Sequence, residues 1–461
     1  MAEALFTGAD LLFGHCDARP AGPMAPAGRL RQRENPILRK EKTNPQNGIP
    51  DSTGRTALQS YGPHNSGGIM RRSIVSAACA VLLLAGTGTA AAGTDPRQAA
   101  LDAAVQAGNV GIIAIAADPA GRWRGRAGVG DITTGTKPDI GGRFRIGSVS
   151  KTFTATLVLK LAAKGRLGLD EPISEYLPGL LPYPEPITVR QLLQHTSGLP
   201  RDLAPQYTWT TLPELDTERF VHFGEVEAIH DSTVQPLLFP PGTGWSYSNT
   251  GYNVLALLVE KLTGRRFEQV LADWITGPLH LADTLLPRDF PLVPGAAMHG
   301  YEQLYPAPHG LTDVTAYNLS RYFGAGDIIS SATDLNRFFH ALLGGELLPA
   351  GLLAQMKTTV PWPDTDGRIG YGLGLMRISL VGPCGPGAPD VWGHAGDVPG
   401  YNTWSMSDET GTRRITVGSS PDVTASQDAA SGRLLAMVTE FCTPNLPGAQ
   451  ASAARIQAAI R

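Results

Sequence analysis

The 461-residue chain lacks the motifs that mark several large classes of protein. It contains no Gly-x-Ser-x-Gly segment, which argues against an α/β-hydrolase. Its ten histidines show neither a His-Glu-x-x-His motif nor a paired spacing of metal ligands, so we expect no metal site. No internal repeat is visible, and the length allows one large domain or two smaller ones.

Positive charge is scarce over most of the chain. The formal net charge is −3, and the two signs are unevenly distributed: residues 1–72 carry ten Lys and Arg against six Asp and Glu, and the remaining residues carry 28 against 35. An acidic body argues against nucleic acid as a partner. Residues 1–72, which carry the excess of positive charge, have no interleaved aromatic residues and are typical of a solvated segment.

Long apolar runs are also missing. The most apolar stretch runs only from Ile74 to Ala85, which is short for a transmembrane helix. It follows Met70-Arg71-Arg72 and precedes three alanines that end at Ala92, so it has the basic start, apolar centre and Ala-x-Ala end of a secretory signal peptide. We therefore expect a signal peptide at 70–92, cleavage near Ala92, and a secreted product without a stable membrane anchor.

Residues 1–69 hold few large apolar side chains, and the stretch 29–68 is rich in Pro, Gly, Asn and charged residues. Such a segment cannot bury enough apolar surface to fold. Because a signal peptide should begin near the start of a chain, we expect Met70 to be the true initiator and 1–69 to be a disordered or wrongly assigned extension. The alternative is a cytoplasmic head on a signal anchor, and N-terminal sequencing of the native precursor distinguishes the two.

Cysteine is rare as well, with four in the whole chain. Cleavage after Ala92 would leave only Cys384 and Cys442. Two cysteines in an exported protein favour a disulfide between them, and two free thiols are the alternative. Neither cysteine lies beside a recognisable base, so we do not expect either to be catalytic.

The order of helical and strand patterns predicts the fold class. Strand-like runs occur near both ends of the mature chain, and helical patterns lie between them. This order predicts an α+β fold, in which one antiparallel sheet is built from both chain ends and flanked by helices. The expected elements are helices at 96–107, 251–262, 334–343 and 429–441, a hairpin of 110–117 with 121–128, helical turns through 148–198, a loop-like region at 200–238, short strands through 371–417 and a tail at 443–461.

The most informative local feature is Ser148, which is followed three positions later by Lys151. Residues three apart on a helix share a face, so the Lys151 amine can reach the Ser148 hydroxyl. A serine becomes a good nucleophile when a neighbouring group takes its proton or stabilises its alkoxide. Gly147 permits a sharp turn before the helix, and a helix N-terminus suits a developing oxyanion. Taken alone, the pair can equally be a surface lysine near a helix cap.

Two further segments carry groups suited to such chemistry. Tyr247-Ser-Asn249 lies on a loop, where a tyrosine near an ammonium can act as a base and Asn249 can donate to a substrate carbonyl. His394-Ala-Gly396 lies between strand-like runs, where His394 can supply a cation or a donor and Gly396 lets a substrate backbone approach. The alternatives are a loop tyrosine that packs on the core and an unspecific His-x-Gly, since another begins at His222.

Together and in this order, the three segments resemble the penicillin-recognising serine hydrolases: serine DD-peptidases, class C β-lactamases and related esterases. More narrowly, the chain is similar to secreted D-alanyl-D-alanine carboxypeptidases of the actinobacterial type. The resemblance runs across most of 95–442 and includes the segments 187–199 and 370–375 and the late cysteine pair. It implies a β-lactamase-like domain over 93–442, with a mostly helical subdomain beside the sheet.

The resemblance implies a two-step acyl transfer without a cofactor. Ser148 would attack an amide or ester carbonyl to form an acyl-enzyme, Lys151 and Tyr247 would share the proton transfers, and Asn249 would orient the substrate. The backbone N–H groups of Ser148 and Asp397 would form the oxyanion hole. The implied ligands are peptides or esters, cell-wall peptides above all, with β-lactams as covalent ligands, and we expect a monomer.

A second serine and histidine invite a different interpretation, because His195 and Ser197 could belong to a catalytic triad. The family has a similar turn that stays away from the chemistry. We therefore interpret the segment from Gln194 to Gly198 as a structural turn.

The chain departs from the family where a carboxypeptidase holds the C-terminal carboxylate of its substrate. Hydroxyl residues near the His-x-Gly motif and a nearby arginine serve there in the family, whereas this chain has Ala395 and Asp397. The Asp397 carboxylate would repel a substrate carboxylate. Arg377 could compensate, although strand alternation can point it the other way. An esterase, an amidase, a D-amino-acid amidase or a class C-like β-lactamase is therefore the alternative, and a ligand sensor without turnover is the alternative from another class.

Overall fold

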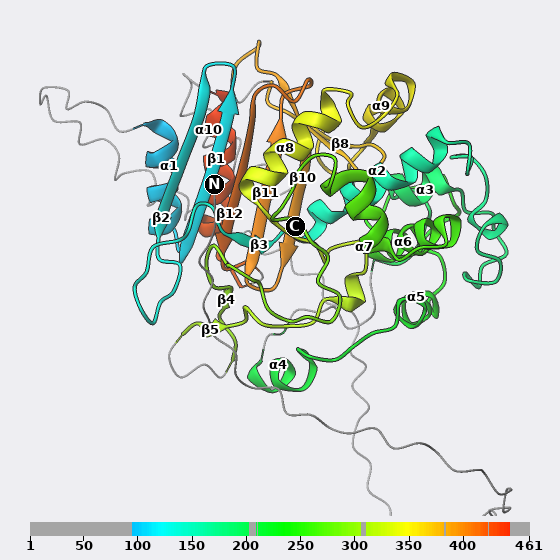
Figure 1. Ribbon diagram of the computed structural model, residues 1–461, viewed down its shortest axis with the longest axis horizontal. Coiled ribbons are helices and arrows are strands. Elements are labelled where there is room, and N and C mark those ends of the chain that lie inside the picture. Colours follow the sequence, from blue (N-terminus) through cyan, green and yellow to red (C-terminus); the bar gives the residue numbers. More distant parts are fainter. Residues whose placement is uncertain are drawn as a thin grey trace, which may run out of the picture. The chain divides into compact units, whose positions relative to one another are not determined.

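A computed structural model of the chain describes residues 95–201, 209, 211–305, 310–381, 384–422 and 424–442. The expected extension, signal peptide and C-terminal tail lie outside these residues. Figure 1 shows the arrangement of the elements. The strands are β1 (Gly111–Asp118), β2 (Gly121–Gly128), β3 (Arg143–Arg145), β4 (Tyr301–Glu302), β5 (Thr312–Asp313), β6 (Ile329–Ser331), β7 (Val360–Pro361), β8 (Ile369–Tyr371), β9 (Met376–Ser379), β10 (Asp390–Val398), β11 (Tyr401–Ser407) and β12 (Arg414–Ser420).

The α-helices are α1 (Pro96–Gln106), α2 (Ser150–Ala163), α3 (Val189–Gln194), α4 (Leu212–Glu218), α5 (Glu225–Thr233), α6 (Asn249–Thr263), α7 (Phe267–Leu271), α8 (Ala332–Leu343), α9 (Ala350–Lys357) and α10 (Gln427–Cys442). Short 3-10 turns are η1 (Gly147–Val149), η2 (Ile173–Glu175) and η4 (Ser320–Tyr322), and η3 (Ala272–Thr276) is a π-helical turn. The helices expected at 96–107, 334–343 and 429–441 are confirmed to within about two residues.

Strands from both ends of the chain form one antiparallel sheet of eight strands, as the sequence predicts. Their order is β2-β1-β12-β11-β10-β9-β8-β7. Figure 1 shows the N-terminal hairpin beside the C-terminal strands, and Gly111 of β1 lies opposite Ser420 of β12. The α+β prediction is therefore confirmed, and the C-terminal strand β10 lies inside the sheet between β11 and β9.

The sheet separates two hydrophobic cores. Ile112 and Ala114 of β1 pack in a cluster with Leu101 of α1 and with residues of α10. Ile113 and Ile115 belong to the other, larger cluster, which also contains residues of α2 and α8. Because successive side chains of a strand point to opposite faces, α1 and α10 cover one face of the sheet and α8 covers the other.

The helical part of the molecule gathers around α2, beside the sheet (Figure 1). Eleven of the 14 residues of α2 are buried, so this helix is surrounded by other elements on nearly all sides. It begins at Ser150, which leaves Ser148 on the preceding turn η1 and not on the helix itself. A buried central helix gives the residues at its start a fixed frame.

The region expected to be loop-like at 200–238 contains two helices, α4 and α5, and this expectation was wrong there. Local hydrogen bonds define the start of α4: Thr211 Oγ1 accepts from the Glu214 N–H, and the Glu214 carboxylate accepts from the Thr211 N–H. Such a capping box stabilises a helix whose composition is polar. The polar composition of this region therefore gave no sign of helices in the sequence, and a helix there is stabilised by capping at its start.

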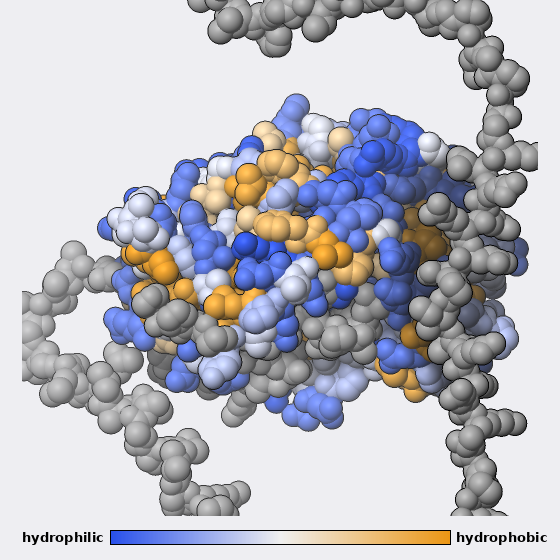
Figure 2. Space-filling model, turned by 90° about the horizontal axis from the view of Figure 1, so that it is seen from below, coloured by the Kyte–Doolittle hydropathy of each residue, from blue (hydrophilic) through white to orange (hydrophobic). Residues whose placement is uncertain are grey.

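The expected disulfide is present in the structure, where Cys384 is joined to Cys442 with the two Cα atoms 5.0 Å apart. It connects the segment after β9 with the last residue of α10. On the face shown in Figure 2, hydrophobic residues form small patches separated by hydrophilic ones. Within the described ranges, no helix is both long and apolar enough to cross a membrane.

Candidate active site

Ser148 lies on the turn that joins β3 to α2, and its side chain is half-buried. The turn depends on Gly147, whose φ of 51° is in the left-handed region that favours glycine. A Cβ atom at Gly147 would come within 2.7 Å of the backbone nitrogen of Asp397. The turn that presents Ser148 therefore presses directly against β10.

Lys151 is fully buried one position into α2 and donates three hydrogen bonds. Its Nζ lies 3.0 Å from Ser148 Oγ, 2.5 Å from Asn249 Oδ1 and 2.8 Å from the carbonyl oxygen of Ala325. An ammonium group has three donors, and these three acceptors match them. The arrangement holds a positive charge next to the serine oxygen.

Tyr247 stands on the loop before α6, where its side chain is half-buried. Lys151 Nζ lies 4.9 Å from the centre of the tyrosine ring, and the Arg201 guanidinium carbon lies 5.2 Å from it. Asn249 is the first residue of α6, and Ser248 caps that helix by accepting from the Gly251 N–H. The structure thus brings the Ser148, Lys151, Tyr247 and Asn249 segments together around one ammonium group.

His195 fixes the backbone of the tyrosine loop. Its Nδ1 accepts from the Ser248 N–H at 3.1 Å, and its carbonyl oxygen accepts from the Ser246 N–H at 3.0 Å. Burial, and after it the charge of Lys151, lowers the pKa of His195 well below its usual value, so the ring is neutral. Ser197 Oγ accepts from the Leu199 N–H. These contacts agree with a structural turn and give His195 no role as a base.

The two backbone N–H groups expected to form an oxyanion hole come from η1 and β10. A Cβ atom at Gly396 would lie 3.0 Å from the Ser148 nitrogen and 1.9 Å from the carbonyl oxygen of Ile146. Only a glycine permits this approach, which places the N–H groups of Ser148 and Asp397 beside each other. Two such donors next to a nucleophile suit the negative charge that develops in acyl transfer.

His394 differs from its expected role as a cation near Tyr247. It is buried, its Nδ1 donates to the carbonyl oxygen of Ala395, and its Nε2 accepts from Tyr371 Oη at 2.8 Å. Burial lowers the pKa of His394 to about 3. Of the two expected roles, cation or donor, the cation is therefore wrong, and Nδ1 donates inside the core to the Ala395 carbonyl. The sequence does not show that both ring nitrogens have partners there.

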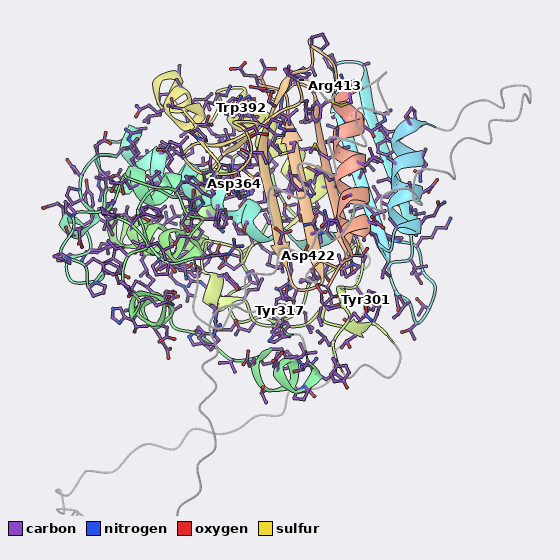
Figure 3. The ribbon with its side chains drawn as sticks, turned by 180° about the vertical axis from the view of Figure 1, so that it is seen from behind. Tyr301, Tyr317, Asp364, Trp392, Arg413 and Asp422 are labelled. Carbon is purple, nitrogen blue, oxygen red and sulfur yellow. A yellow bond between two sulfur atoms is a disulfide. The ribbon has the colours of Figure 1, made fainter. Side chains whose placement is uncertain are left out.

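Arg377 also lies away from the expected carboxylate site. Its Nη1 pairs with Asp390 Oδ2 at 2.7 Å, and its Nη2 donates to the carbonyl oxygen of Gly367. Arg377 of β9 lies opposite Trp392 of the neighbouring strand β10. Trp392 is four residues, or roughly 13 Å, away from Gly396 along β10. In Figure 3, Trp392 lies toward the opposite end of the sheet from Asp422. Strand alternation and an acidic partner direct Arg377 elsewhere, so it does not compensate for Asp397.

The Asp397 side chain is exposed beside the turn that carries Ser148. Asn402 holds it, because Asn402 Nδ2 donates to Asp397 Oδ1 and, at 3.2 Å, to Asp422 Oδ1. Asp422 is buried and pairs with Arg433 at 2.9 Å. Burial, and next the charge of Asp397, raises the pKa of Asp422 well above its usual value. Sequence reasoning missed Asn402 and Asp422, since no local motif links them to Asp397.

Sequence reasoning also missed an aromatic wall around Tyr247. The rings of Trp245 and Trp362 lie 4.5 Å apart, and the Trp362 ring lies 5.9 Å from that of Tyr247. Trp245 stands only two positions before Tyr247, which is a possible signal in the sequence, but Trp362 comes from the segment between β7 and β8. Within the part of the chain that the structure describes, no group of three or more His, Cys, Asp or Glu side chains could hold a metal ion.

Comparison with known proteins agrees with this geometry. A family model described as Beta-lactamase matches residues 85–426. Penicillin-binding protein 4 of Amycolatopsis lactamdurans is 32% identical over 218 residues, which are 45% of this chain and 52% of that protein. The chain spans 52 to 59% of the length of its penicillin-binding relatives from that organism and from Bacillus subtilis.

Two solved structures share the fold over nearly their whole length. A D-stereospecific amidohydrolase from a Streptomyces species is 33% identical, with a TM-score of 0.67 over 75% of this chain and 98% of that one. The D-amino acid amidase of Ochrobactrum anthropi SV3 is 26% identical, with a TM-score of 0.62 over 79% of this chain and 97% of that one. The family model covers well over half of the chain, which is therefore a serine hydrolase of the beta-lactamase family.

Proposed function

We propose that this serine hydrolase cleaves amides of D-amino acids that carry a free α-amino group. The proposal rests on the exposed carboxylate of Asp397 beside the Ser148 turn. It rests also on Arg377, which pairs with Asp390 and therefore does not neutralise Asp397. A carboxylate at this place favours a substrate that brings an ammonium group and disfavours one that brings a carboxylate. The two amide-hydrolysing neighbours in fold support both the amide and its D configuration.

In the proposed reaction, Ser148 Oγ attacks the amide carbonyl carbon while its proton passes to Tyr247. Tyr247 is the general base of this scheme, and the positive charges of Lys151 and Arg201 lie 4.9 and 5.2 Å from the centre of its ring. Lys151 stabilises the serine oxygen through its 3.0 Å hydrogen bond, and the N–H groups of Ser148 and Asp397 donate to the oxyanion.

The intermediate then collapses with cleavage of the C–N bond. The departing nitrogen takes the proton from Tyr247, which leaves ammonia and an ester between the D-amino acid and Ser148. Water attacks this ester after it gives a proton to Tyr247, and the D-amino acid is released as the proton returns to Ser148 Oγ. Asn249, whose Oδ1 accepts from Lys151, orients the substrate in this scheme.

A D-alanyl-D-alanine carboxypeptidase that β-lactams acylate is the second candidate. The Ser148, Tyr247 and His394 segments and the penicillin-binding relatives favour it. Its substrate ends in a carboxylate, however, and the residue after Gly396 is the carboxylate Asp397, whereas Arg377 on the neighbouring strand pairs with Asp390 at the other end of β10. An esterase would use the same nucleophile and oxyanion hole, and a sensor would stop at the acyl-enzyme or bind without one.

Hydrolysis rates on three substrates test the proposal. We expect kcat/KM for D-alanine amide to exceed that for L-alanine amide and that for N-acetyl-D-Ala-D-Ala, each by at least about tenfold, a free-energy difference of about 1.4 kcal/mol. Ser148→Ala should lose the activity on all of them, and Ser197→Ala should retain it. A faster reaction with the N-acetyl dipeptide would replace the proposal by the carboxypeptidase, and stoichiometric release without turnover would favour the sensor.

A further inference from the structure

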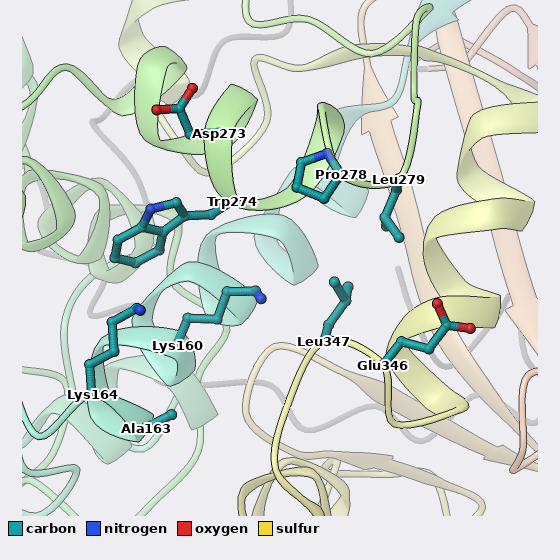
Figure 4. A pocket seen from close by; sticks show the side chains of 9 residues that line it. All are labelled: Lys160, Ala163, Lys164, Asp273, Trp274, Pro278, Leu279, Glu346 and Leu347. Carbon is teal, nitrogen blue, oxygen red and sulfur yellow. The ribbon is translucent and has the colours of Figure 1, made fainter.

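A cavity of about 530 Å³ lies at the far end of α2 from the catalytic serine. Its walls come from the C-terminal half of α2, from the π-helical turn η3 and the residues after it, and from the turn that follows α8. Figure 4 shows the lining side chains. They are Lys160, Ala163, Lys164, Asp273, Trp274, Pro278, Leu279, Glu346 and Leu347.

The cavity is separate from the candidate active site although both use α2. Lys160 follows Lys151 by nine residues, which corresponds to about 13.5 Å along the helix axis and about half a turn around it. Lys151 therefore faces Ser148, whereas Lys160 faces η3 on the other side of the helix. A ligand in this cavity would not contact the catalytic groups.

Two ammonium groups give the α2 wall of the cavity a positive charge, while the two carboxylates of the lining, Asp273 and Glu346, lie on other walls. Lys160 is half-buried, and among the described residues neither Lys160 nor Lys164 forms an ion pair. Asp273, the nearest acidic residue on η3, is already paired with Arg265 at 2.7 Å. Burial, and then the charge of Lys164, lowers the pKa of Lys160, as expected for two like charges without a counter-ion.

Besides Asp273 and Glu346, the rest of the lining is apolar and includes one flat surface. Lys164 Nζ lies 5.3 Å from the centre of the Trp274 ring, so the indole forms the wall next to the charge. Leu279 and Leu347 line the cavity farther along, and Figure 4 shows Glu346 beside Leu347, away from the Trp274 ring. An aromatic face and aliphatic side chains next to two cations match an apolar ring or chain that ends in an anion.

We propose that this cavity is a second ligand site, which binds a carboxylate or sulfonate carried on a flat apolar group. The anion lies between Lys160 and Lys164 and relieves their mutual repulsion, and the apolar group stacks on Trp274 and covers Leu279 and Leu347. The site is independent of the proposed amidase activity, because no catalytic side chain lines it.

Titration calorimetry of the full chain with 2-naphthoate tests the site, with the neutral 2-naphthalenemethanol as the matched probe. We expect 2-naphthoate to bind with one-to-one stoichiometry and at least tenfold more tightly than the alcohol, and we expect added salt to weaken it. Lys160→Gln and Lys164→Gln should each weaken binding several-fold, whereas Lys137→Gln, at an exposed lysine elsewhere, should not. Equal binding of the two probes, or binding unchanged in both cavity variants, would overturn the proposal.

Two further variants test whether binding occurs at the candidate active site and whether a loss of binding reflects a disturbed fold. Ser148→Ala should bind 2-naphthoate as the parent does, which excludes the candidate active site as the place of binding, and loss of binding in this variant would contradict the proposal. Because Lys160 is half-buried, its substitution can disturb the fold. Lys164→Glu changes only an exposed side chain and should abolish binding while D-alanine amide hydrolysis and the melting temperature stay unchanged.

Discussion

At the scale of single residues, hydrogen bonds between distant parts of the chain fix the charges of the site. Lys151 reaches Asn249 and the carbonyl oxygen of Ala325, which lie 98 and 174 residues away in sequence. Asp397 is held by Asn402 from the neighbouring strand. These contacts decide where positive and negative charge lie relative to Ser148, and in the proposed function they determine which substrate charge the site accepts.

Asn402→Ala should raise KM for D-alanine amide several-fold with little change in kcat. The substitution removes the donor that bridges Asp397 and Asp422, so the Asp397 carboxylate loses its fixed direction while the nucleophile keeps its contacts. Steady-state kinetics measures both constants. Asn253→Ala provides a matched control, because Asn253 is also buried but donates to the carbonyl oxygen of Arg321. A loss of kcat at unchanged KM would contradict the positioning role.

The free energy of unfolding should depend on pH through Asp327, which lies in the turn that carries Ala325. Burial raises the pKa of Asp327 to about 7 from its usual value near 4. A carboxyl with a raised folded-state pKa contributes most stability below its unfolded pKa, and this contribution falls as the pH rises toward 7. The loss amounts to about 1.4 kcal/mol for each pH unit within that window.

Urea unfolding at pH 5, 6, 7 and 8 checks this dependence in the parent and in Asp327→Asn. The asparagine keeps an oxygen that can accept from the Gly324 N–H but cannot ionise. The stability of the variant relative to the parent should therefore increase from pH 5 to 7 and then level off. A difference that is constant over the whole range would show that Asp327 does not titrate there.

At the scale of elements, sequence patterns predicted what depends on local periodicity. The hairpin of β1 and β2, the helices α1, α8 and α10 and the late strands follow from apolar spacing and turn residues. Helix α4 was missed because capping contacts at its start, and not an apolar stripe, define it, and α5 was missed because only a few of its residues are apolar and buried. The direction of Arg377 and the partners of His394 were missed because they depend on which residue of another element lies opposite.

Gly396→Ala should reduce kcat by about 10²- to 10³-fold, because the new Cβ would lie 1.9 Å from the carbonyl oxygen of Ile146 and would push β10 away from the Ser148 turn. The same overlap should cost about 1 to 3 kcal/mol of stability. Gly351→Ala in α9 is the control, since its added Cβ meets no atom within 4 Å and alanine favours helix by up to about 1 kcal/mol. Kinetics and thermal melting check both variants, and a normal kcat in Gly396→Ala would argue against the proposed oxyanion hole.

At the scale of the whole molecule, the site exists because the two ends of the domain meet in one sheet. The proposed nucleophile follows β3, whereas the second proposed oxyanion donor comes from β10 near the C-terminal end. Contacts between the ends support this arrangement: Arg97 of α1 pairs with Glu440 of α10 at 3.2 Å, and Asn109 donates to the carbonyl oxygen of Ala429. Catalytic geometry and global stability are therefore linked.

Removal of the disulfide should destabilise the whole domain. Cys384 and Cys442 are 58 residues apart in sequence, and closing a loop of that length stabilises a protein by about 4 kcal/mol in the chain-entropy model. Urea unfolding of the parent should show a lower free energy of unfolding with dithiothreitol than without it. The Cys384→Ser/Cys442→Ser double variant should have the stability of the reduced parent, and dithiothreitol should not change it. An unchanged midpoint in the reduced parent would exclude a stabilising disulfide.

In the proposed function, Asp397 selects a substrate ammonium over a substrate carboxylate, and one ratio of rate constants measures this selection. That ratio is kcat/KM for D-alanine amide divided by kcat/KM for N-acetyl-D-Ala-D-Ala, measured in the parent and in Asp397→Thr. We expect Asp397→Thr to lower the ratio by at least about tenfold, since the variant loses the attraction for the amine and the repulsion of the carboxylate. A ratio that is the same in both proteins would show that Asp397 does not select the substrate charge and would favour the carboxypeptidase or esterase interpretation.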